Sequence, residues 1–496
     1  MGTRNLSNSQ LFGRIDFTPS ERHTLTVSGS DYNFSTRGWF SAPLSTPASG
    51  AEYSAESWRI QASLTSHFGA WVNDVRMSDA QEKYGATSRI SATSGSVIIP
   101  SSQQTSGLGS GISTLSFGGS PFAAQLTSST TIDTKDELSW LSSDGAHRAK
   151  LGTSLTIARG TGGVPGNTLG SYRFNSLSDL QNGIPASYSR TLAPTNQASA
   201  TSDAAFYIGD AWRTGPKLQL VYGFRVEHSV FRDPPGLNQA AATAFGIHTN
   251  AFPTETRFIP RLGFTYFVGA GDKKPAVVTI RGGIGVFRGG ASQVSETFAA
   301  ARDATGLADS QSQINCVGAA VPQLDWNYFS ASSAGLPIAC ASGAPNTGVA
   351  ALPNVVAIDP SFQVPRTLRA SLGASRQFAK IWNVSIDGSV SEGYAGTGTR
   401  DLNLAASPKF MLATEGNRPV YVAPGAIIPT TGAIALSDSR VNPAFGAVSL
   451  VSSSLRSEYQ SLTLSVGRSL PKLSINGSYS YSNGRMQVLA TSVGNT

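Results

Sequence analysis

The sequence of 496 residues contains no long apolar run. Its longest uninterrupted apolar stretches are a few residues, whereas a membrane-spanning helix needs about 20. Any segment that crosses a membrane must therefore be a β-strand. The first residues, MGTRNLSNSQ, also lack the apolar core of a signal peptide, and Leu6 stands where a myristoylation pattern requires Ser or Thr.

Charged residues are scarce. They make up 14% of the chain, against about 25% in typical soluble domains. The 37 basic and 30 acidic residues give a net charge of +7, but Lys and Arg are scattered singly rather than clustered on one segment. This distribution argues against a nucleic-acid-binding surface. The 52 glycines and the abundant Ser and Thr fit strands with one face of small polar residues.

Cysteine is nearly absent. Cys316 and Cys340 lie in the same predicted loop, where a disulfide in an oxidising compartment is predicted, with two unpaired small residues as the alternative. The five histidines are dispersed and none flanks a cysteine, so neither a metal site nor a cofactor is expected.

The stretch from Asp203 to Gly290 carries the clearest pattern. Between Leu218 and His228, apolar side chains alternate with small or polar ones, as in a β-strand with one apolar and one hydrated face. The apolar positions are Leu218, Leu220, Tyr222, Phe224 and Val226, and the other face carries Gln219, Gly223, Arg225 and Glu227. Strands this long exceed the about 5 to 6 residues usual in soluble sheets and suit a tilted strand that crosses a bilayer in roughly 9 to 11.

The same unit recurs as hairpins of two strands joined by a turn of a few residues. About fourteen strands are predicted, in hairpins at residues 10–34, 57–83, 131–158, 203–231, 259–289, 367–392 and 459–481. No charged linker or shift in composition divides the chain, so residues 1–496 are interpreted as a single all-β region.

Short turns alternate with loops of roughly twenty to seventy residues, which the sequence predicts to be structureless. This asymmetry is typical of outer-membrane barrels, which have short periplasmic turns and long surface loops. The predicted fold is therefore an antiparallel transmembrane β-barrel with long extracellular loops, in the outer membrane of a Gram-negative cell and surrounded by its lipid.

Four of the seven tryptophans lie beside short turns. Membrane barrels carry aromatic belts at the interface because an amphipathic ring is stable where apolar and wet regions meet. The alternative is that these rings cap a soluble core. The belt candidates are Trp71, Trp140, Trp212 and Trp382.

Several segments resemble the barrel of TonB-dependent outer-membrane receptors, especially the Oar-like group. They include FYIGDAWRTGPKLQLVYGFRVE, FIPRLGFTYFV, VTIRGGIGVFRGG and SEYQSLTLSVGRSLPKLSINGSYSYSNGR, and they extend from about residue 10 to 485. The resemblance implies a 22-stranded barrel filled by a plug, with a TonB box that contacts an energising complex.

The sequence departs from that pattern because no plug or TonB box is recognisable, and the chain ends in the polar tail ATSVGNT rather than on a terminal strand with a final aromatic residue. The simplest interpretation is the middle of a larger receptor, incomplete at both ends, that takes up a large unknown ligand. The alternatives are a complete fourteen-stranded passive channel and a surface adhesin without energy coupling.

No arrangement of residues predicts an enzyme. Alternation sends Asp136 and Glu137 to opposite faces, so these carboxylates and nearby Asp133 are interpreted as lumen or interface charges. The glycines from Gly282 to Gly285 precede no phosphate-binding helix and instead indicate a bend or the close approach of another backbone.

The predicted transport through the barrel interior gives two further sets of residues a role. Arg225, Glu227, Arg281 and Asp387 are predicted to face the lumen, keep it hydrated and contact a plug that is missing from this chain. Trp326, Tyr328 and Phe329 in the longest loop are ligand-contact candidates, although they could equally pack the loop on itself.

Successive side chains of the strand at Leu218 are predicted to face opposite sides of the sheet. Substitutions at neighbouring positions should therefore have opposite outcomes. Leu220→Arg places a charge on the lipid face, where the cost near the midplane is roughly 2 to 4 kcal/mol, so assembly should fail. Gln219→Arg places the same charge in the lumen and should be tolerated. Heat-modifiable folding in lipid measures both variants, and equal folding would contradict the assignment of faces.

Overall fold

The computed structural model describes most of the chain. The described residues are 5–39, 44–100, 111–121, 125–161, 166–192, 198–271, 274–290, 294–308, 310–330, 335–341, 352–379, 381–413, 416–429 and 432–487. The polar tail at residues 490–496 lies outside these ranges.

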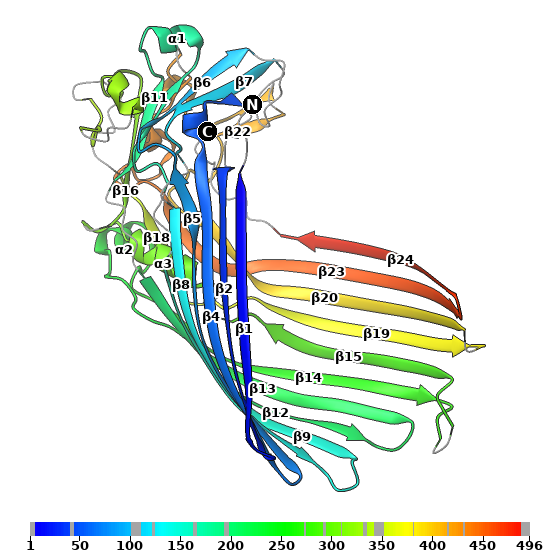
Figure 1. Cartoon of the computed structure of the whole chain (residues 1–496). Helices are drawn as coiled ribbons and strands as arrows, with labels where there is room; N and C mark the ends of the chain where they lie inside the picture. The colour runs from blue at the N-terminus through cyan, green and yellow to red at the C-terminus, as the bar shows by residue number, and fades with distance from the viewer. Residues whose placement is uncertain are drawn as a thin grey trace.

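Fourteen long strands form one antiparallel sheet in which each strand pairs with the next long strand in the sequence (Figure 1). The predicted antiparallel barrel fold with about fourteen strands is confirmed, and the strands are longer than predicted, from 11 residues in β15 to 23 in β23. Their bounds are β1 Leu6–Ser20, β2 His23–Trp39, β4 Ala51–Phe68, β5 Trp71–Ser88, β8 Gln125–Leu141, β9 His147–Thr161, β12 Ala198–Arg213, β13 Leu218–Phe231, β14 Thr254–Val268, β15 Val278–Arg288, β19 Arg366–Phe378, β20 Trp382–Asp401, β23 Val448–Leu470 and β24 Leu473–Met486.

The short turns have the local chemistry that their sequences predict. Between β8 and β9, the carboxylate of Asp144 accepts hydrogen bonds from the hydroxyl of Ser142 at 2.5 Å and from the backbone N–H of Ala146 at 3.0 Å. Gly145 adopts a φ of 68°, a left-handed conformation that favours glycine. This Asp-Gly turn reverses the chain within a few residues and fixes the register of the hairpin.

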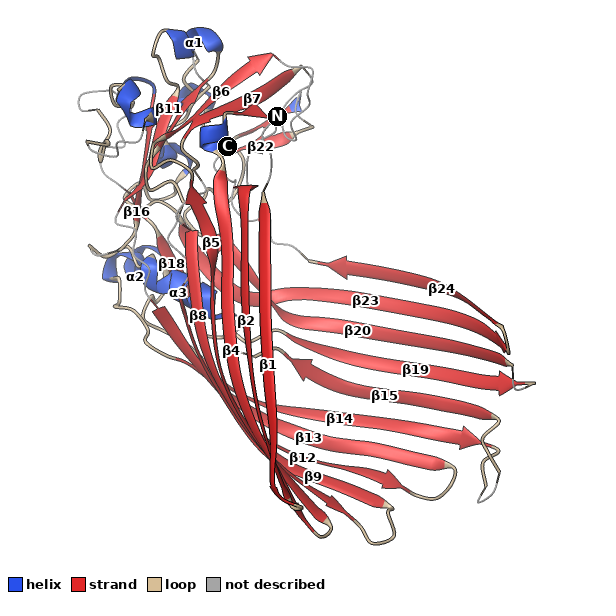
Figure 2. Ribbon diagram, viewed as in Figure 1, coloured by secondary structure: helices blue, strands red, loops and turns tan. Residues whose placement is uncertain are grey.

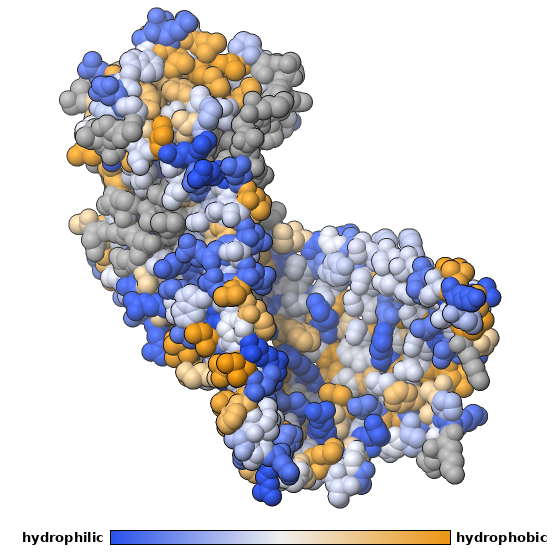
Figure 3. Space-filling model, in the orientation of Figure 1, coloured by the Kyte–Doolittle hydropathy of each residue, from blue (hydrophilic) through white to orange (hydrophobic). Residues whose placement is uncertain are grey.

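The large sheet is an open arc in the part of the chain that the structure describes. β1 pairs only with β2, and β24 pairs only with β23 (Figure 2). Figure 3 shows the deep concave space between the two flanks of the arc. No helix within the described ranges is long and apolar enough to cross a membrane.

The expectation that the long loops are structureless is wrong. Segments from four of them pair into a second, seven-stranded sheet, here called the loop sheet, which lies beyond the loop ends of β1 to β8 (Figure 1). Its order is β17 (Leu352–Pro353), β16 (Ser312–Val317), β11 (Ser187–Leu192), β10 (Ser171–Phe174), β6 (Ser94–Pro100), β7 (Ile112–Gly118) and β3 (Leu44–Ser45). The strands are short and polar at alternate positions, so each loop alone carries little strand signal.

Residues from three loops form the core of the loop sheet, and its aromatic centre comes from the loop between β9 and β12. Tyr172, Phe174 and Tyr188 are almost fully buried, and the rings of Tyr172 and Tyr188 pack with centroids 4.5 Å apart. Ile314 of β16 and Val97 of β6 complete the same cluster. The loops therefore bury their apolar side chains against one another, which no single loop could do.

The remaining elements are short. α1 (Leu177–Gln181) belongs to the loop sheet and begins at Ser176, whose hydroxyl accepts a hydrogen bond from the N–H of Asp179 at 3.0 Å. α2 (Gln239–Phe245), α3 (Ser295–Asp303) and β18 (Val355–Ile358) lie near the loop ends of the long strands. The others are η1 Pro47–Ser49, η3 Gly318–Ala320, η4 Trp326–Phe329, β21 Phe410–Leu412, β22 Arg418–Val420, η6 Pro424–Ala426 and η7 Leu436–Ser439.

The loop sheet is predicted to lose stability in alkali. Burial raises the pKa of Tyr188 to about 12, from an ordinary value of 10.0. The unfolded phenol releases its proton near pH 10, so the stabilisation is fully present below that pH and is lost as pH rises towards 12. Near-ultraviolet circular dichroism should follow this loss. In the Tyr188→Phe variant, the circular dichroism signal should depend less on pH in this range. An alkaline midpoint equal to that of the native chain would contradict the assignment of the loss to Tyr188.

Candidate functional site

The two faces of the large sheet differ in their contacts. On β13, Arg225 and Glu227 share one face and form an ion pair, with 2.5 Å between Nε and Oε1. Tyr222 and Phe224 lie on the opposite face, with exposed fractions of 42% and 38%. In the register between β12 and β13, Tyr207 pairs with Arg225, so Tyr207 lies on the same face of the sheet as Arg225.

Helix α3 identifies the concave face. Phe298 of α3 stacks on Phe231 of β13 with ring centroids 3.9 Å apart, and Phe231 has the parity of Arg225 and Glu227. The helix also contacts β9, β12 and β18, and β18 pairs with β23, far along the sheet from β12. A segment that joins such distant strands of a curved sheet lies on its concave side. The face of Arg225 and Glu227 is thus the inner wall, and the opposite face is the outer wall.

A buried charged network joins four strands at the loop end of the inner wall. Its centre is Arg288 of β15, whose side chain is 2% exposed. The guanidinium lies 2.8 Å from Glu255, 3.1 Å from Glu227 and 3.7 Å from Asp203, which belong to β14, β13 and β12. It also donates a hydrogen bond of 2.8 Å to the hydroxyl of Ser229. Buried charges are tolerated only when they are paired and hydrogen-bonded in this way.

The same network holds the segment that contains α3 and β18. The carboxylate of Glu255 accepts a hydrogen bond of 3.1 Å from the backbone N–H of Val364. It also pairs with Arg257 at 2.6 Å and with Arg366 at 3.8 Å. Val364 is fully buried in the apolar cluster around Phe298. The charged network and the apolar cluster therefore fix one inserted segment against the wall.

Arg281 and Asp387, two of the predicted lumen residues, form a more exposed pair on the inner wall. Their side chains are 62% and 38% exposed, and the ion pair measures 2.8 Å. The pair spans β19 at Gly373, where an added Cβ would lie 2.2 Å from Oδ1 of Asp387. Glycine at this position therefore leaves room for the carboxylate.

The neighbouring carboxylates of β8 separate as the alternation predicts. Glu137 points inward and accepts hydrogen bonds from Lys135 at 2.9 Å and from Lys150 at 2.6 Å. Asp136 points outward and accepts a hydrogen bond of 2.6 Å from Asn73. This arrangement gives Glu137 a structural role in a basic part of the wall and supplies no acid and base pair.

The four belt candidates all lie on the outer wall beside short turns. Trp71 and Trp140 face each other across β5 and β8, with ring centroids 6.1 Å apart. Trp212 lies opposite Leu220 in the register of β12 and β13. Trp382 lies beneath a guanidinium of β23, which is 5.0 Å from its ring centroid. They share one face and lie beside short turns, and the aromatic belt stays a prediction.

The three loop aromatics pack mainly on other loops. Phe329 lies against Phe117, with centroids 5.1 Å apart, and the Tyr328 hydroxyl donates to the carbonyl of Gly335 at 3.1 Å. Trp326 stacks on the edge of the same core but remains 52% exposed. Of the three candidates, Trp326 therefore presents the largest free surface.

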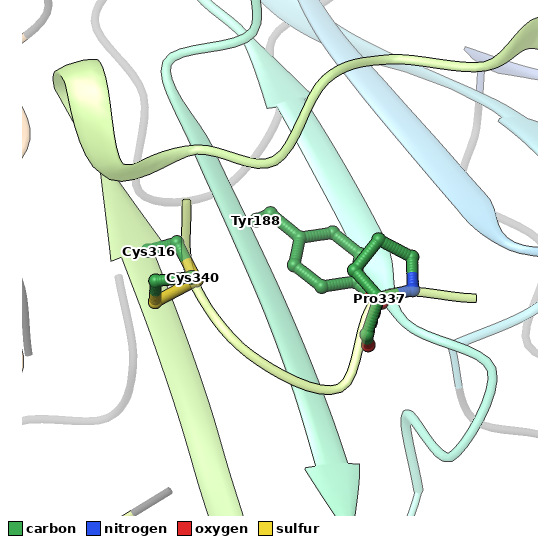
Figure 4. Close-up of a disulfide and its surroundings, with 4 residues drawn as sticks. All are labelled: Tyr188, Cys316, Pro337 and Cys340. Carbon is green, nitrogen blue, oxygen red and sulfur yellow. Dashed lines mark hydrogen bonds between the residues drawn. A yellow bond between two sulfur atoms is a disulfide. The ribbon is translucent and has the colours of Figure 1, made fainter. Parts of the chain in front are cut away.

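A disulfide fastens the longest loop to the loop sheet (Figure 4). It joins Cys316 of β16 to Cys340, with 5.4 Å between the Cα atoms. The adjacent segment is held further because Tyr188 donates a hydrogen bond of 3.2 Å to the carbonyl of Pro337. Arg190 donates to the same carbonyl at 3.1 Å. The bridge thus stabilises a surface built from several loops.

One kind of site, a metal centre, has no representative within the described ranges. No group of three or more His, Cys, Asp or Glu side chains there could hold a metal ion.

Sequence reasoning missed Arg288, Glu255 and Asp203 as one network. In the sequence, the only sign of this network is one charged residue near the loop end of each of three strands. Which of these charges come into contact is decided by the strand register, and that register is set only in the folded sheet.

Comparison with known proteins supports this architecture. A sequence profile described as "Outer membrane beta barrel domain" matches residues 2–495. The fold is similar to that of the outer membrane transporter YddB from Escherichia coli, with a TM-score of 0.57, 10% identity, and coverage of 97% of this chain and 48% of that one. It is also similar to the FrpB iron transporter from Neisseria meningitidis (F5-1 variant), with a TM-score of 0.52, 8% identity, and coverage of 97% and 54%.

This chain spans about half the length of those structures. No curated protein sequence matches it. The similarities confirm, as a matter of fold, the resemblance to outer-membrane receptor barrels of the TonB-dependent class, and they do not distinguish the Oar-like group.

The buried network predicts unequal effects for two arginines of β15. Arg288→Ala leaves three carboxylates without their common partner and should lower the free energy of unfolding by about 3 to 5 kcal/mol. Arg281→Ala removes an exposed pair and should cost at most about 1 kcal/mol. Urea unfolding followed by tryptophan fluorescence in lipid vesicles compares them. Equal losses would contradict the central position of Arg288.

Proposed function

The chain belongs to the outer-membrane β-barrel domain family and resides in the outer membrane, and from this premise we propose that it forms the barrel wall of a receptor that takes up a ligand across that membrane. The observation that carries the proposal is the charged inner wall, crossed at its loop end by the segment that contains α3. A wall of this kind suits a hydrated interior that is obstructed at one end.

The obstruction distinguishes this interior from that of a wide open pore. Phe298, Phe362 and Val364 form an apolar cluster on the concave side, and the Glu255 carboxylate binds the backbone of the same segment. The Tyr84 hydroxyl of β5 also donates to Glu296 of α3. A passing solute would meet this segment before the middle of the wall, so we infer controlled rather than free passage.

Closure of the barrel requires partners for two edges. Within the described ranges, the outer edges of β1 and β24 are unpaired. Each unpaired backbone group in hydrocarbon costs several kcal/mol. We propose that further strands close the barrel, as the 22-stranded resemblance implies, and that residues 1–496 are one incomplete barrel region of the whole receptor.

Energy coupling is the finer part of the proposal. The similar structures are an outer membrane transporter and an iron transporter by their descriptions. By analogy with them, we propose that a plug outside this chain occupies the interior and contacts the TonB complex. Arg225, Glu227, Arg281 and Asp387 lie on the wall that such a plug would face.

Ligand capture is assigned to the loop sheet. Four loops build it and the Cys316–Cys340 disulfide fastens one of them, so the surface keeps a defined shape. Trp326 offers a half-exposed ring on this surface, and aromatic rings supply large contact area at low entropic cost. Phe329 packs against Trp326 with ring centroids 5.8 Å apart, and Tyr328 packs against the same aromatic cluster.

Solute depletion in living cells tests uptake. The gene is deleted in its host and restored as the native full-length gene, and the spent medium of both strains is compared by mass spectrometry with and without a protonophore. We expect solutes that only the restored strain depletes, and we expect the protonophore to stop their depletion.

Two results would reject this account. Depletion that continues in the presence of the protonophore would identify a passive channel. Identical media from the two strains, with normal amounts of the protein in the membrane, would exclude uptake and favour an adhesin.

A further inference from the structure

The inner wall contains a hollow between the charged network and the short turns. Its volume is about 700 Å³, within the range of roughly 300 to 1,000 Å³ that small-molecule sites occupy. The lining comes from β8, β9, β12, β13, β14, β15 and β19. The wall is recessed there because lining glycines pair across neighbouring strands, Gly209 with Gly223 and Gly263 with Gly283. We call this feature the basic hollow.

Among the charged residues of this otherwise largely apolar lining, basic side chains outnumber acidic ones. Six are present, namely Lys135, Arg148, Lys150, Arg225, Arg261 and Arg369, against two carboxylates. Both carboxylates are already engaged. Glu137 binds two lysines and the hydroxyl of Tyr207, while the carboxylate of Asp210 points to the outer wall, where it pairs with His147 at 2.7 Å. The positive charge of the hollow is therefore not balanced by its own acidic residues.

Two arginines are positioned without an acidic partner. The guanidinium carbons of Arg261 and Arg369 lie 4.5 Å and 5.9 Å from the ring centroid of Phe287. Among the described residues neither forms a salt bridge, and the hydrogen bond from Nε of Arg369 goes to the hydroxyl of Ser391 at 3.2 Å. Stacking on one ring holds two planar donor groups together at the edge of the hollow.

Glycines allow these side chains to lie along the wall. An added Cβ at Gly285 would lie 3.0 Å from Cγ of Arg261. At Gly152 it would lie 2.3 Å from the ring of Tyr207, which packs 5.6 Å from the guanidinium of Arg225. The absence of these two side chains thus opens the space that the arginines and the tyrosine occupy.

We propose that the basic hollow binds a solute through its carboxylate or phosphate groups, with Arg261 and Arg369 as the principal contacts. Arginine donates paired hydrogen bonds to both kinds of anion, and the planar fork matches their geometry. Lys135, Lys150 and Arg225 add attraction from the opposite side of the hollow. This inference deepens the proposed uptake function and names an anionic solute as the class that the inner wall recognises.

Equilibrium binding to the native full-length receptor, purified in detergent, tests the site without requiring transport. Isothermal titration calorimetry is performed with citrate as the carboxylate probe and with inorganic phosphate as the phosphate probe. The test variant is Arg261→Gln with Arg369→Gln. The matched control is Arg14→Gln together with Arg76→Gln, which removes the same charge from inner-wall arginines of β1 and β5, each paired with its own carboxylate outside the hollow.

The native chain should bind at least one probe saturably, and the probe with the higher affinity identifies the preferred anion. The Arg261/Arg369 variant should weaken that binding by roughly tenfold or more, while the control stays within about twofold. Absence of saturable binding to both probes, or equal weakening in test and control variants, would overturn the proposal.

A second variant keeps the test decisive if the glutamine form does not fold. Replacing both arginines by lysine preserves the charge but removes the planar forks, and it should still weaken binding by about threefold or more. Unchanged affinity in that variant would also overturn the proposal. Because no transport is measured, binding could persist even if the depletion experiment shows no uptake, so the two proposals fail separately.

Discussion

Backbone hydrogen bonding in a medium without water is the constraint on which this structure depends. A strand in hydrocarbon must give every N–H and C=O group a partner on its neighbours. Except at the outer edges of β1 and β24, the fourteen long strands do so by pairing in sequence order. Pairing in a fixed register also fixes parity, because a shift of one residue would exchange the two faces of a strand. Hence Arg225 and Glu227 share a wall with Tyr207, whereas Tyr222 and Phe224 face the opposite way.

The same register brings together charges that lie far apart in the sequence. Arg288 meets carboxylates from three other strands, and its 2% exposure shows that this meeting is buried. A network with so little contact with water gives the loop end of the wall a defined geometry, and Glu255 extends that geometry to the backbone of the inserted segment. The inner wall is thus rigid at the loop end and more open near the middle, where the basic hollow lies.

Sequence reasoning succeeded where local physics decides the structure. Period-two alternation, the Asp144-Gly145 turn and strand length were enough to predict the hairpins and which side chains of β13 share a face. It failed for the loops because their strands are stabilised by partners from other loops. Tyr172 and Tyr188, for example, belong to the same long loop but pack against Val97 and Ile314 from two others. Side-chain clusters such as Arg261, Phe287 and Arg369 were also beyond prediction, since they depend on strand order, register and the space left by glycines.

The most direct test of the central claim is a scan of single cysteines along β13 from Gln219 to Glu227, each labelled with an environment-sensitive fluorophore in lipid vesicles. Quenchers are placed either on the lipid chains or in the aqueous phase. The account predicts alternation with a period of two residues, with lipid quenching at Leu220, Tyr222 and Phe224 and aqueous quenching at Gln219, Gly223 and Arg225. Uniform quenching along the strand, or the reverse alternation, would contradict a membrane wall with a polar inner face.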